Sequence, residues 1–271
     1  MADLKITLVQ SELYWENIDK NLDMFARKII SIGDTTDLII LPEMFSTGFT
    51  MNAEACAEEM NGKTIEWLKS IAKEKNCVVT GSVIIKDKAL SSMKKVGDEA
   101  FYNRLIWMKP DGTFQHYDKR HLFSLANEQL TYTAGDKKII TEIKGWKICP
   151  LICYDLRFPV WSRRTKEQDY DLLLYVANWP ERRIYAWKQL LVARAIENQS
   201  FVAGVNRVGN DVNDIHHTGY SCVIDYRGDH LSKTKPDEES IDTVSLNKKL
   251  LLDFRKQFAF GDDRDEFRII I

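Results

Sequence analysis

The chain has 271 residues, and 44% of them are hydrophobic, so it is long and apolar enough to bury a sizeable core. Its 38 Lys and Arg residues nearly balance its 40 Asp and Glu residues, which gives a formal net charge of -2. This balance argues against nucleic acid and membrane partners and favours a small-molecule substrate.

The cysteines and the N-terminal residues bear on the compartment. The chain has five cysteines, an odd number, and only Cys149 and Cys153 lie close together, so reduced thiols are favoured over a disulfide framework. The first residues enter a strand-like stretch without a leader-type segment, and no apolar run is long enough to span a bilayer. We therefore expect a soluble cytoplasmic protein. Because no linker composition is visible, a single domain over residues 1–271 is expected.

In the first half of the chain, predicted strands alternate with predicted helices. Apolar patterns predict strands at 4–9, 37–41 and 77–85, and helices at 18–29 and 62–76. The strand–helix–strand order favours parallel pairing. Residues 47–60 are predicted as a loop that borders the site, and the Lys-rich residues 86–98 as a surface turn.

The middle of the chain predicts two hairpins separated by an aperiodic stretch. The turn sequence Lys109-Pro110-Asp111-Gly112 joins predicted strands at 101–108 and 113–117. Residues 119–134 have no clean period, so we expect them to form a wall of the active site. A second hairpin, 138–143 with 146–151, leads directly to Cys153.

The second half repeats the alternation of helices and strands. The pattern predicts a short helix at 158–167, a strand at 172–176, a long helix at 184–198, a strand at 201–205, a loop at 209–217, a hairpin of 221–225 with 230–234, and a last strand at 243–246. Two such halves are typical of two sheets packed face to face with helices outside, an α/β architecture.

Three reactive side chains each follow a predicted strand. Cys153 stands on a strand-to-helix turn, Glu43 follows Leu38–Leu41, and Lys119 follows the strand that ends at Tyr117. A thiol with its ordinary pKa of about 8.5 needs a base or a positive neighbour to act as a nucleophile at neutral pH. Glu43 could supply the base, and Lys119 could supply the positive neighbour.

The flanks of these residues resemble those of the nitrilase or carbon–nitrogen hydrolase superfamily, and most nearly its bacterial omega-amidases. The motifs that carry the resemblance are Leu41-Pro42-Glu43-Met44-Phe45, Asp118-Lys119-Arg120-His121-Leu122-Phe123, Cys153-Tyr154-Asp155-Leu156-Arg157-Phe158-Pro159 and Tyr175-Val176-Ala177-Asn178-Trp179-Pro180. The resemblance implies a four-layer αββα sandwich. It also implies hydrolysis, without a cofactor or metal, of the terminal amide of a small dicarboxylic or 2-oxo acid such as 2-oxoglutaramate.

The resemblance further implies a role for each catalytic residue. Cys153 attacks the amide carbonyl and forms a thioester, and Glu43 transfers the protons. Lys119 and the backbone N–H of Tyr154 hold the oxyanion. Glu128 is expected to orient the ammonium group of Lys119, because the family has a second glutamate about this far after its lysine.

The substrate-binding residues are less sharply defined by sequence. The candidates adjoin the catalytic positions or follow a strand that ends nearby: Tyr154, Phe45, Phe123, Asn178 and Trp179. A cation should meet the free carboxylate of an omega-amidase substrate. Arg157, Arg182 and Arg183 are candidates, and sequence does not choose among them.

Other functions and mechanisms remain open at this stage. An N-carbamoyl or other aliphatic amide is the alternative substrate, whereas nitrile chemistry is disfavoured because Tyr154-Asp155 replaces the Trp-Glu of true nitrilases. A papain-like pair of Cys153 with His121 is the alternative mechanism, and a non-catalytic binding protein is the alternative function. His216 and His217, with Cys222, lack further metal ligands at suitable spacing and are expected to be solvated.

The last expectation concerns assembly. Members of the resembled superfamily pair two sandwiches through helices next to the nucleophile. Here the helices at 159–167 and 184–198 carry Val160, Trp161 and Trp187 among other large apolar residues. We therefore expect a homodimer built on these two helices.

Overall fold

The first sheet is built mainly from the first half of the chain. The computed structural model describes residues 2–33, 35–88 and 98–270. Six strands pair in the order β13-β1-β2-β3-β4-β5. They are β1 (Leu4–Gln10), β2 (Leu38–Ile40), β3 (Val78–Lys88), β4 (Glu99–Met108), β5 (Phe114–Asp118) and β13 (Ser240–Leu246). Strands β1, β2 and β3 are parallel because helices α1 (Ile18–Ile30) and α3 (Lys63–Lys75) carry the chain back between them.

The second sheet has five strands in the order β12-β9-β8-β7-β6, and β7, β8 and β9 are parallel. Its strands are β6 (Thr141–Ile143), β7 (Trp146–Ile152), β8 (Leu172–Ala177), β9 (Phe201–Asn206) and β12 (Cys222–Ile224), and a separate two-stranded ribbon consists of β10 (Val208–Asn210) and β11 (His216–Thr218). The remaining helical segments are α2 (Ala53–Cys56), η1 (Ser124–Ala126), α4 (Glu128–Thr131), η2 (Cys153–Arg157), α5 (Pro159–Ser162), η3 (Glu181–Arg183), α6 (Ile184–Asn198), α7 (Lys248–Gln257) and η4 (Phe260–Asp263).

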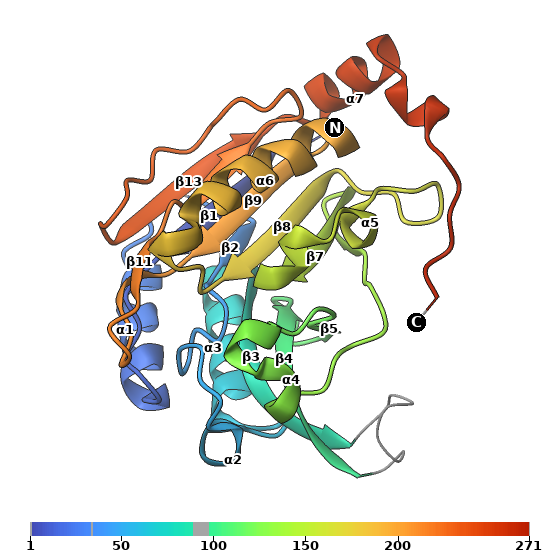
Figure 1. Cartoon of the computed structure of the whole chain (residues 1–271). Helices are drawn as coiled ribbons and strands as arrows, with labels where there is room; N and C mark the ends of the chain where they lie inside the picture. Colours follow the sequence, from blue (N-terminus) through green and yellow to red (C-terminus); the bar gives the residue numbers. More distant parts are fainter. Residues whose placement is uncertain (1, 34, 89–97, 271) are drawn as a thin grey trace.

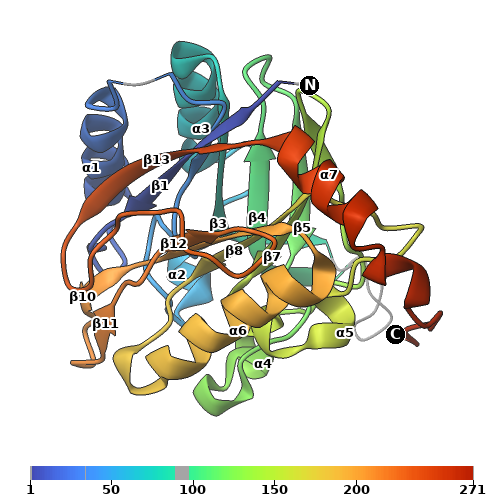
Figure 2. The same cartoon turned by 90° about the horizontal axis from the view of Figure 1, so that it is seen from above.

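The two sheets pack against each other, and helices cover their outer faces. Helices α1 and α3 lie outside the first sheet, and α5 and α6 lie outside the second (Figure 1), as the view from above also shows (Figure 2). The expected αββα sandwich is therefore confirmed. None of the helices within the described ranges combines the length and apolarity needed to cross a bilayer.

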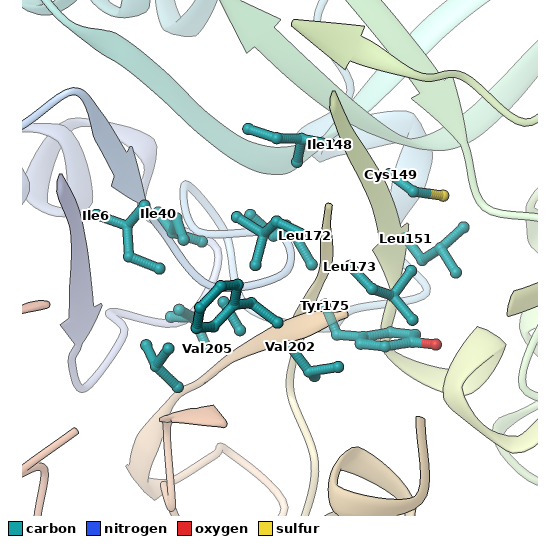
Figure 3. Packing of buried hydrophobic residues seen from close by; sticks show 14 of the residues in the cluster. Ile6, Ile40, Ile148, Cys149, Leu151, Leu172, Leu173, Tyr175, Val202 and Val205 are labelled. Atoms are coloured by element: carbon teal, nitrogen blue, oxygen red, sulfur yellow. The ribbon is translucent and has the colours of Figure 1, made fainter. Parts of the chain in front are cut away.

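Successive residues along each strand point to opposite faces of the sheet, and this alternation explains how the layers pack. Ile6 and Ile40 of the first sheet face Leu172 of the second in the shared core (Figure 3). The intervening residues, such as Val9 and Ile39, pack instead beneath α1 and α3. The residues of β8 are buried on both faces, as expected for a strand between another sheet and a helix. The rigid double sheet holds the strand ends that carry the reactive residues.

The structure corrects several predicted elements. The helix expected at 158–167 ends at Ser162, where Lys138 donates to the carbonyl oxygen of Trp161. The residues 209–217, expected to be a loop, form most of the β10–β11 ribbon. The hairpin expected at 221–234 has only one regular strand, β12, and a single bridge to His230.

Two further differences lie near the ends of predicted segments. Helix α7 has no counterpart in the predicted elements. The side chain of Asn247 caps this helix by accepting a hydrogen bond from Leu250 N. Leu251 is its one buried residue. The last strand begins at Ser240 and pairs antiparallel with β1 along its length. Of the surface turn expected at 86–98, residues 89–97 lie outside the described part of the chain.

Candidate active site

The reactive residues come from the carboxyl ends of strands in both sheets. Glu43 lies three residues beyond β2, Lys119 directly follows β5, and Cys153 directly follows β7. Asn178 directly follows β8. Because the sheets pack face to face, these four chain segments meet at one edge of the sandwich.

Cys153 is held on a sharp turn between β7 and the short helix η2. Its φ of 44° lies in the left-handed region that residues other than glycine rarely adopt. The backbone N–H of Tyr154 is in the first turn of η2, where N–H groups have no acceptor within the helix. The turn therefore presents the thiol beside a free donor, as a nucleophile and its oxyanion site require.

Lys119 is clamped between two carboxylates. Its Nζ donates to Glu43 Oε1 at 2.8 Å, and to Glu128 Oε2 and Oε1 at 2.9 and 3.0 Å. All three side chains are at most 1% exposed. Phe123 N also donates to Glu128 Oε2 at 2.5 Å, which fixes this carboxylate from the other side. The structure thus brings together the lysine and the two glutamates that the sequence suggested.

Two asparagines fix the carboxylate of Glu43. Asn103 Nδ2, on β4, donates to Glu43 Oε1 at 2.8 Å, and the Asn178 backbone N–H donates to Oε2 at 2.8 Å. Asn178 Nδ2 donates to the backbone oxygen of Glu43 at 2.5 Å. Sequence reasoning missed Asn103. The available signal was the polar pair Asn103-Arg104 within the largely apolar stretch 101–108, which is unusual unless the side chains are needed there.

The charges at the site keep Cys153 protonated. Burial raises the pKa of the Cys153 thiol, the negative charge of Glu43 raises it further, and Lys119 opposes them only in part. Burial alone would lower the pKa of Lys119, but Glu128 and Glu43 outweigh it and raise the pKa. Burial also raises the pKa of Glu128, against the attraction of Lys119. Two carboxylates face one ammonium, so an added thiolate would lack a counter-charge.

A cavity of about 390 Å³ opens onto these groups, a size typical of small-molecule sites. Its walls include Glu43, Lys119 and Cys153. Four of the predicted substrate-binding residues also line it: Tyr154, Phe123, Asn178 and Trp179. Phe49, Thr50 and Met51 also line it, and they belong to the 47–60 segment that was predicted to border the site. Sequence reasoning did not identify the lining residues from 207–217, because only the fold brings them to the cavity.

Phe45 is the exception among the predicted substrate-binding residues. It is completely buried in the core beneath α1 and α3, and its ring lies 5.6 Å from that of Phe25 and 5.9 Å from that of Trp67. The chain turns at Met44, whose φ is 43°, and this turn directs Phe45 into the helix layer. Phe45 therefore supports the Glu43 segment from behind and is not among the residues that line the cavity.

The contacts of His121 do not support the papain-like alternative. Its Nδ1 lies 2.8 Å from Asp155 Oδ1, and its ring stacks on Phe158 at 3.6 Å between centroids. Among the described residues that line the cavity, Glu43 is present and His121 is not. The geometry therefore favours Glu43 as the base.

The two histidines of the ribbon differ from expectation. His216 is partly exposed and contacts Asn210 and Asp237, but His217 is 4% exposed and lines the cavity. The expectation that both are solvated is therefore wrong for His217, because β11 pairs with β10 and turns this side chain inward. Within the described residues, no group of His, Cys, Asp and Glu side chains is arranged to hold a metal ion.

This fold and site agree with the comparison to known proteins. Residues 5–256 match the family model described as carbon-nitrogen hydrolase, so the chain belongs to the carbon-nitrogen hydrolase family. It is similar to the omega-amidase YafV of Escherichia coli strain K12, with 43% identity over 99% of this chain and 100% of the relative. It is also similar to the 2-oxoglutaramate amidase of Bacillus subtilis, with 34% identity over 84% of each chain.

A solved structure supports the same assignment. The crystal structure of XC1258 from Xanthomonas campestris, a CN-hydrolase superfamily protein with an arsenic adduct in its active site, superposes with a TM-score of 0.89. The identity is 42%, and the match covers 99% of this chain and 100% of that one. The resemblance to this superfamily and to bacterial omega-amidases that the sequence motifs indicated is confirmed.

Proposed function

We propose that the protein is an omega-amidase, which hydrolyses the terminal amide of a small 2-oxo or dicarboxylic acid, such as 2-oxoglutaramate, to the acid and ammonia. The observation that carries this proposal is that Glu43, Lys119 and Cys153 line one cavity, and that Glu128 forms a second buried ion pair with Lys119. The omega-amidase and 2-oxoglutaramate amidase relatives support the choice of substrate class.

The first half of the reaction forms a thioester and releases ammonia. As the Cys153 sulfur attacks the amide carbon, Glu43 takes the thiol proton, so the sulfur is never a free thiolate in the resting enzyme. The carbonyl oxygen becomes an oxyanion held by Lys119 and the Tyr154 backbone N–H. When the carbon–nitrogen bond breaks, Glu43 returns the proton to the leaving nitrogen, which departs as ammonia.

The second half of the reaction restores the enzyme. Glu43 removes a proton from a water molecule, whose oxygen attacks the thioester carbon and regenerates the oxyanion. The carbon–sulfur bond then breaks, Glu43 returns its proton to the Cys153 sulfur, and the acid is released. Lys119 stays protonated throughout, because its two carboxylate neighbours raise its pKa against the effect of burial.

The domain organisation, the assembly and the cellular location of the protein are also proposals. We propose a single hydrolase domain that works as a homodimer in the cytoplasm. All five cysteines are free and buried, as a reducing compartment would allow. Val160, Tyr185 and Ile196 on α5 and α6 are 54%, 76% and 50% exposed, so these helices offer an apolar surface to a partner subunit.

The test is ammonia release from 2-oxoglutaramate and succinamate, compared between the wild type and Cys153→Ala. We expect the wild type to release ammonia and the variant to release none above the uncatalysed rate. Equal release by both proteins would overturn the assignment of Cys153. An N-carbamoyl amide in the same panel tests the alternative substrate class, and faster release from it would replace the proposed substrate.

A further inference from the structure

Among the residues that the structure describes, Arg207 is a buried cation without a partner of opposite charge. It directly follows β9, is 1% exposed and lines the cavity. Its Nε donates to the carbonyl oxygen of Val208 at 3.1 Å, and one terminal nitrogen donates to that of Asn210 at 2.9 Å. Both acceptors are neutral, so they fix the orientation of the guanidinium without neutralising its charge.

The charge of Arg207 is poorly compensated. Among the described residues, no carboxylate forms an ion pair with it. Burial lowers the pKa of Arg207, and Asp211 and Glu12 oppose this only through longer-range attraction. A buried charge without a counter-ion is costly to the folded protein. Such a group is expected where a bound anion supplies the missing charge.

The other arginines of the cavity are placed differently. Arg157 lies over the ring of Trp179 at 5.0 Å, and Arg183 over the ring of Phe123 at 4.8 Å, and both are partly exposed. Arg182 is exposed. Stacked and exposed guanidinium groups are stabilised by aromatic faces and water, so their charges do not require a bound anion.

The order of the strands separates Arg207 from the nucleophile. Arg207 follows β9 and Cys153 follows β7, and β8 lies between these two strands. In an omega-amide the carboxylate lies at the opposite end of the molecule from the reacting carbonyl. A cation two strands away from the sulfur therefore suits this carboxylate.

His217 supplies a second, independent observation at the same wall. It pairs in register with Gly209 through the β10–β11 ribbon, and it lines the cavity. Its Nδ1 is buried without a hydrogen-bond partner among the described residues, and the backbone of Gly209 and of Ile215 lies against the ring. A neutral imidazole donates one hydrogen bond, from either of its ring nitrogens. Because His217 lines the cavity, its imidazole can offer this donor to a bound ligand.

We propose that Arg207 and His217 form the subsite that binds the carboxylate of the substrate, and that this subsite makes the enzyme select anionic amides over neutral ones. The inference rests on the proposed function, since it places the acid end of an omega-amide. Arg207 binds the carboxylate through its guanidinium, and His217 donates a hydrogen bond from its imidazole. The β10–β11 ribbon thus contributes to specificity and not to the chemical step.

The experiment compares succinamate with butyramide, in which a methyl group replaces the carboxylate. Binding is measured by calorimetry in the Cys153→Ala background, and kcat/KM is measured with Cys153 intact. Arg207→Gln should weaken succinamate binding by about 30- to 100-fold, because a charge-assisted contact is lost. Butyramide binding should change by less than about twofold, because it makes no such contact.

The His217 variants test the second contact. His217→Leu should weaken succinamate binding by about tenfold, and His217→Asn should restore part of this loss, because its amide can donate a hydrogen bond. Arg227→Gln is the matched control; Arg227 is exposed on the Tyr226–Asp229 turn and absent from the cavity wall. It should leave both affinities unchanged.

Two results would overturn the subsite. One is an equal loss for both amides in Arg207→Gln, which would indicate a structural role only. The other is a selective loss of succinamate in Arg157→Gln, Arg182→Gln or Arg183→Gln with none in Arg207→Gln. If the wild type releases ammonia from neither amide, the proposed function fails, and calorimetry with Cys153→Ala still decides the subsite.

Discussion

Asp155 and His121 are joined by two contacts to the same oxygen. Asp155 Oδ1 accepts a hydrogen bond from the His121 backbone N–H at 3.0 Å and lies 2.8 Å from His121 Nδ1. Asp155 stands two residues after Cys153, and His121 stands two residues after Lys119. The other oxygen, Oδ2, accepts from the Tyr117 hydroxyl at 2.7 Å. One fully buried carboxylate therefore ties the lysine segment to the cysteine turn.

Asp155→Asn should lower activity, because it weakens the connection between the lysine segment and the cysteine turn. The amide has only one acceptor oxygen, so its NH₂ group would face donors from either Tyr117 or His121. We expect the free energy of unfolding to fall by about 2 kcal/mol. We also expect kcat to change by a larger factor than KM. Urea unfolding and steady-state kinetics test this, with exposed Asp253→Asn as the control. An unchanged kcat in a destabilised variant would show a purely structural role.

Glu43→Gln should nearly abolish turnover, because the amide cannot take the thiol proton. A general base contributes about 10²- to 10⁴-fold to the rate, so kcat should fall by a factor in this range or larger. The circular dichroism spectrum should remain that of the wild type. His121→Ala should cost far less, because its imidazole contacts Asp155 and stacks on Phe158. The reverse ranking would favour the Cys–His mechanism.

Glu128→Gln should lower both stability and activity. It removes one of the two carboxylates that compensate the buried charge of Lys119. Breaking a buried ion pair from one side costs about 3 kcal/mol in unfolding free energy, and the less firmly held Lys119 should lower kcat. Glu66→Gln is the control, since its pair with Lys69 is exposed and should contribute less than about 1 kcal/mol. Equal destabilisation by both variants would contradict this prediction.

His217 should make the protein less stable in mild acid. Burial lowers the pKa of its imidazole to about 4, with Arg207 acting in the same direction, whereas the unfolded chain has the ordinary value of 6.5. Between these values only the unfolded state binds the proton, so this contribution to stability is present above pH 6.5 and is lost as the pH falls toward 4.

The shift corresponds to a loss of about 3 kcal/mol once the pH is below both values. Urea unfolding at pH 7 and pH 4.5 should therefore show a larger difference for the wild type than for His217→Asn. Exposed His230→Asn should behave as the wild type does. A wild-type pH dependence that His217→Asn leaves intact would assign the effect to other groups.

The proposed homodimer predicts that Val160→Asp with Ile196→Asp yields monomers. These side chains are exposed on α5 and α6, while Trp161 and Trp187, which the sequence had suggested for the interface, are buried within one chain. Light scattering should give about twice 31.5 kDa for the wild type and 31.5 kDa for the variant. Ile30→Asp, an exposed substitution on α1, is the control. A wild-type mass of one chain would exclude the dimer.

The meeting of Glu43, Lys119 and Cys153 in the candidate active site was predictable because these residues stand beside recognisable strands and within motifs that resemble those of a known superfamily. Glu43, Lys119 and Cys153 each follow a strand, and local sequence marks where a strand ends. Asn103 was not predictable in this way, because its partner Glu43 is 60 residues distant and on another segment. The contact exists only after β4 and β2 join the same sheet.

The same limit applies to the cavity wall and the outer helices. His217 lies in a polar stretch that reads as a loop, and only its pairing with Gly209 turns it inward. Phe45 lies two residues after Glu43, but the positive φ at Met44 turns it into the core. Apolar spacing identified α6, but it could not show that Trp187 faces its own sheet.

The protonated state of Cys153 also bears on how long the enzyme survives. Peroxides and electrophiles attack thiolates far faster than thiols, so susceptibility to oxidation follows the ionised fraction. Many cysteine enzymes hold a standing thiolate and are consequently sensitive to oxidants. Here burial, Glu43 and Glu128 raise the pKa of the Cys153 thiol, and in the proposed mechanism the sulfur loses its proton only as it attacks a bound carbonyl. If proton transfer waits for attack, as we propose, the same arrangement is expected to protect the idle enzyme from oxidative inactivation.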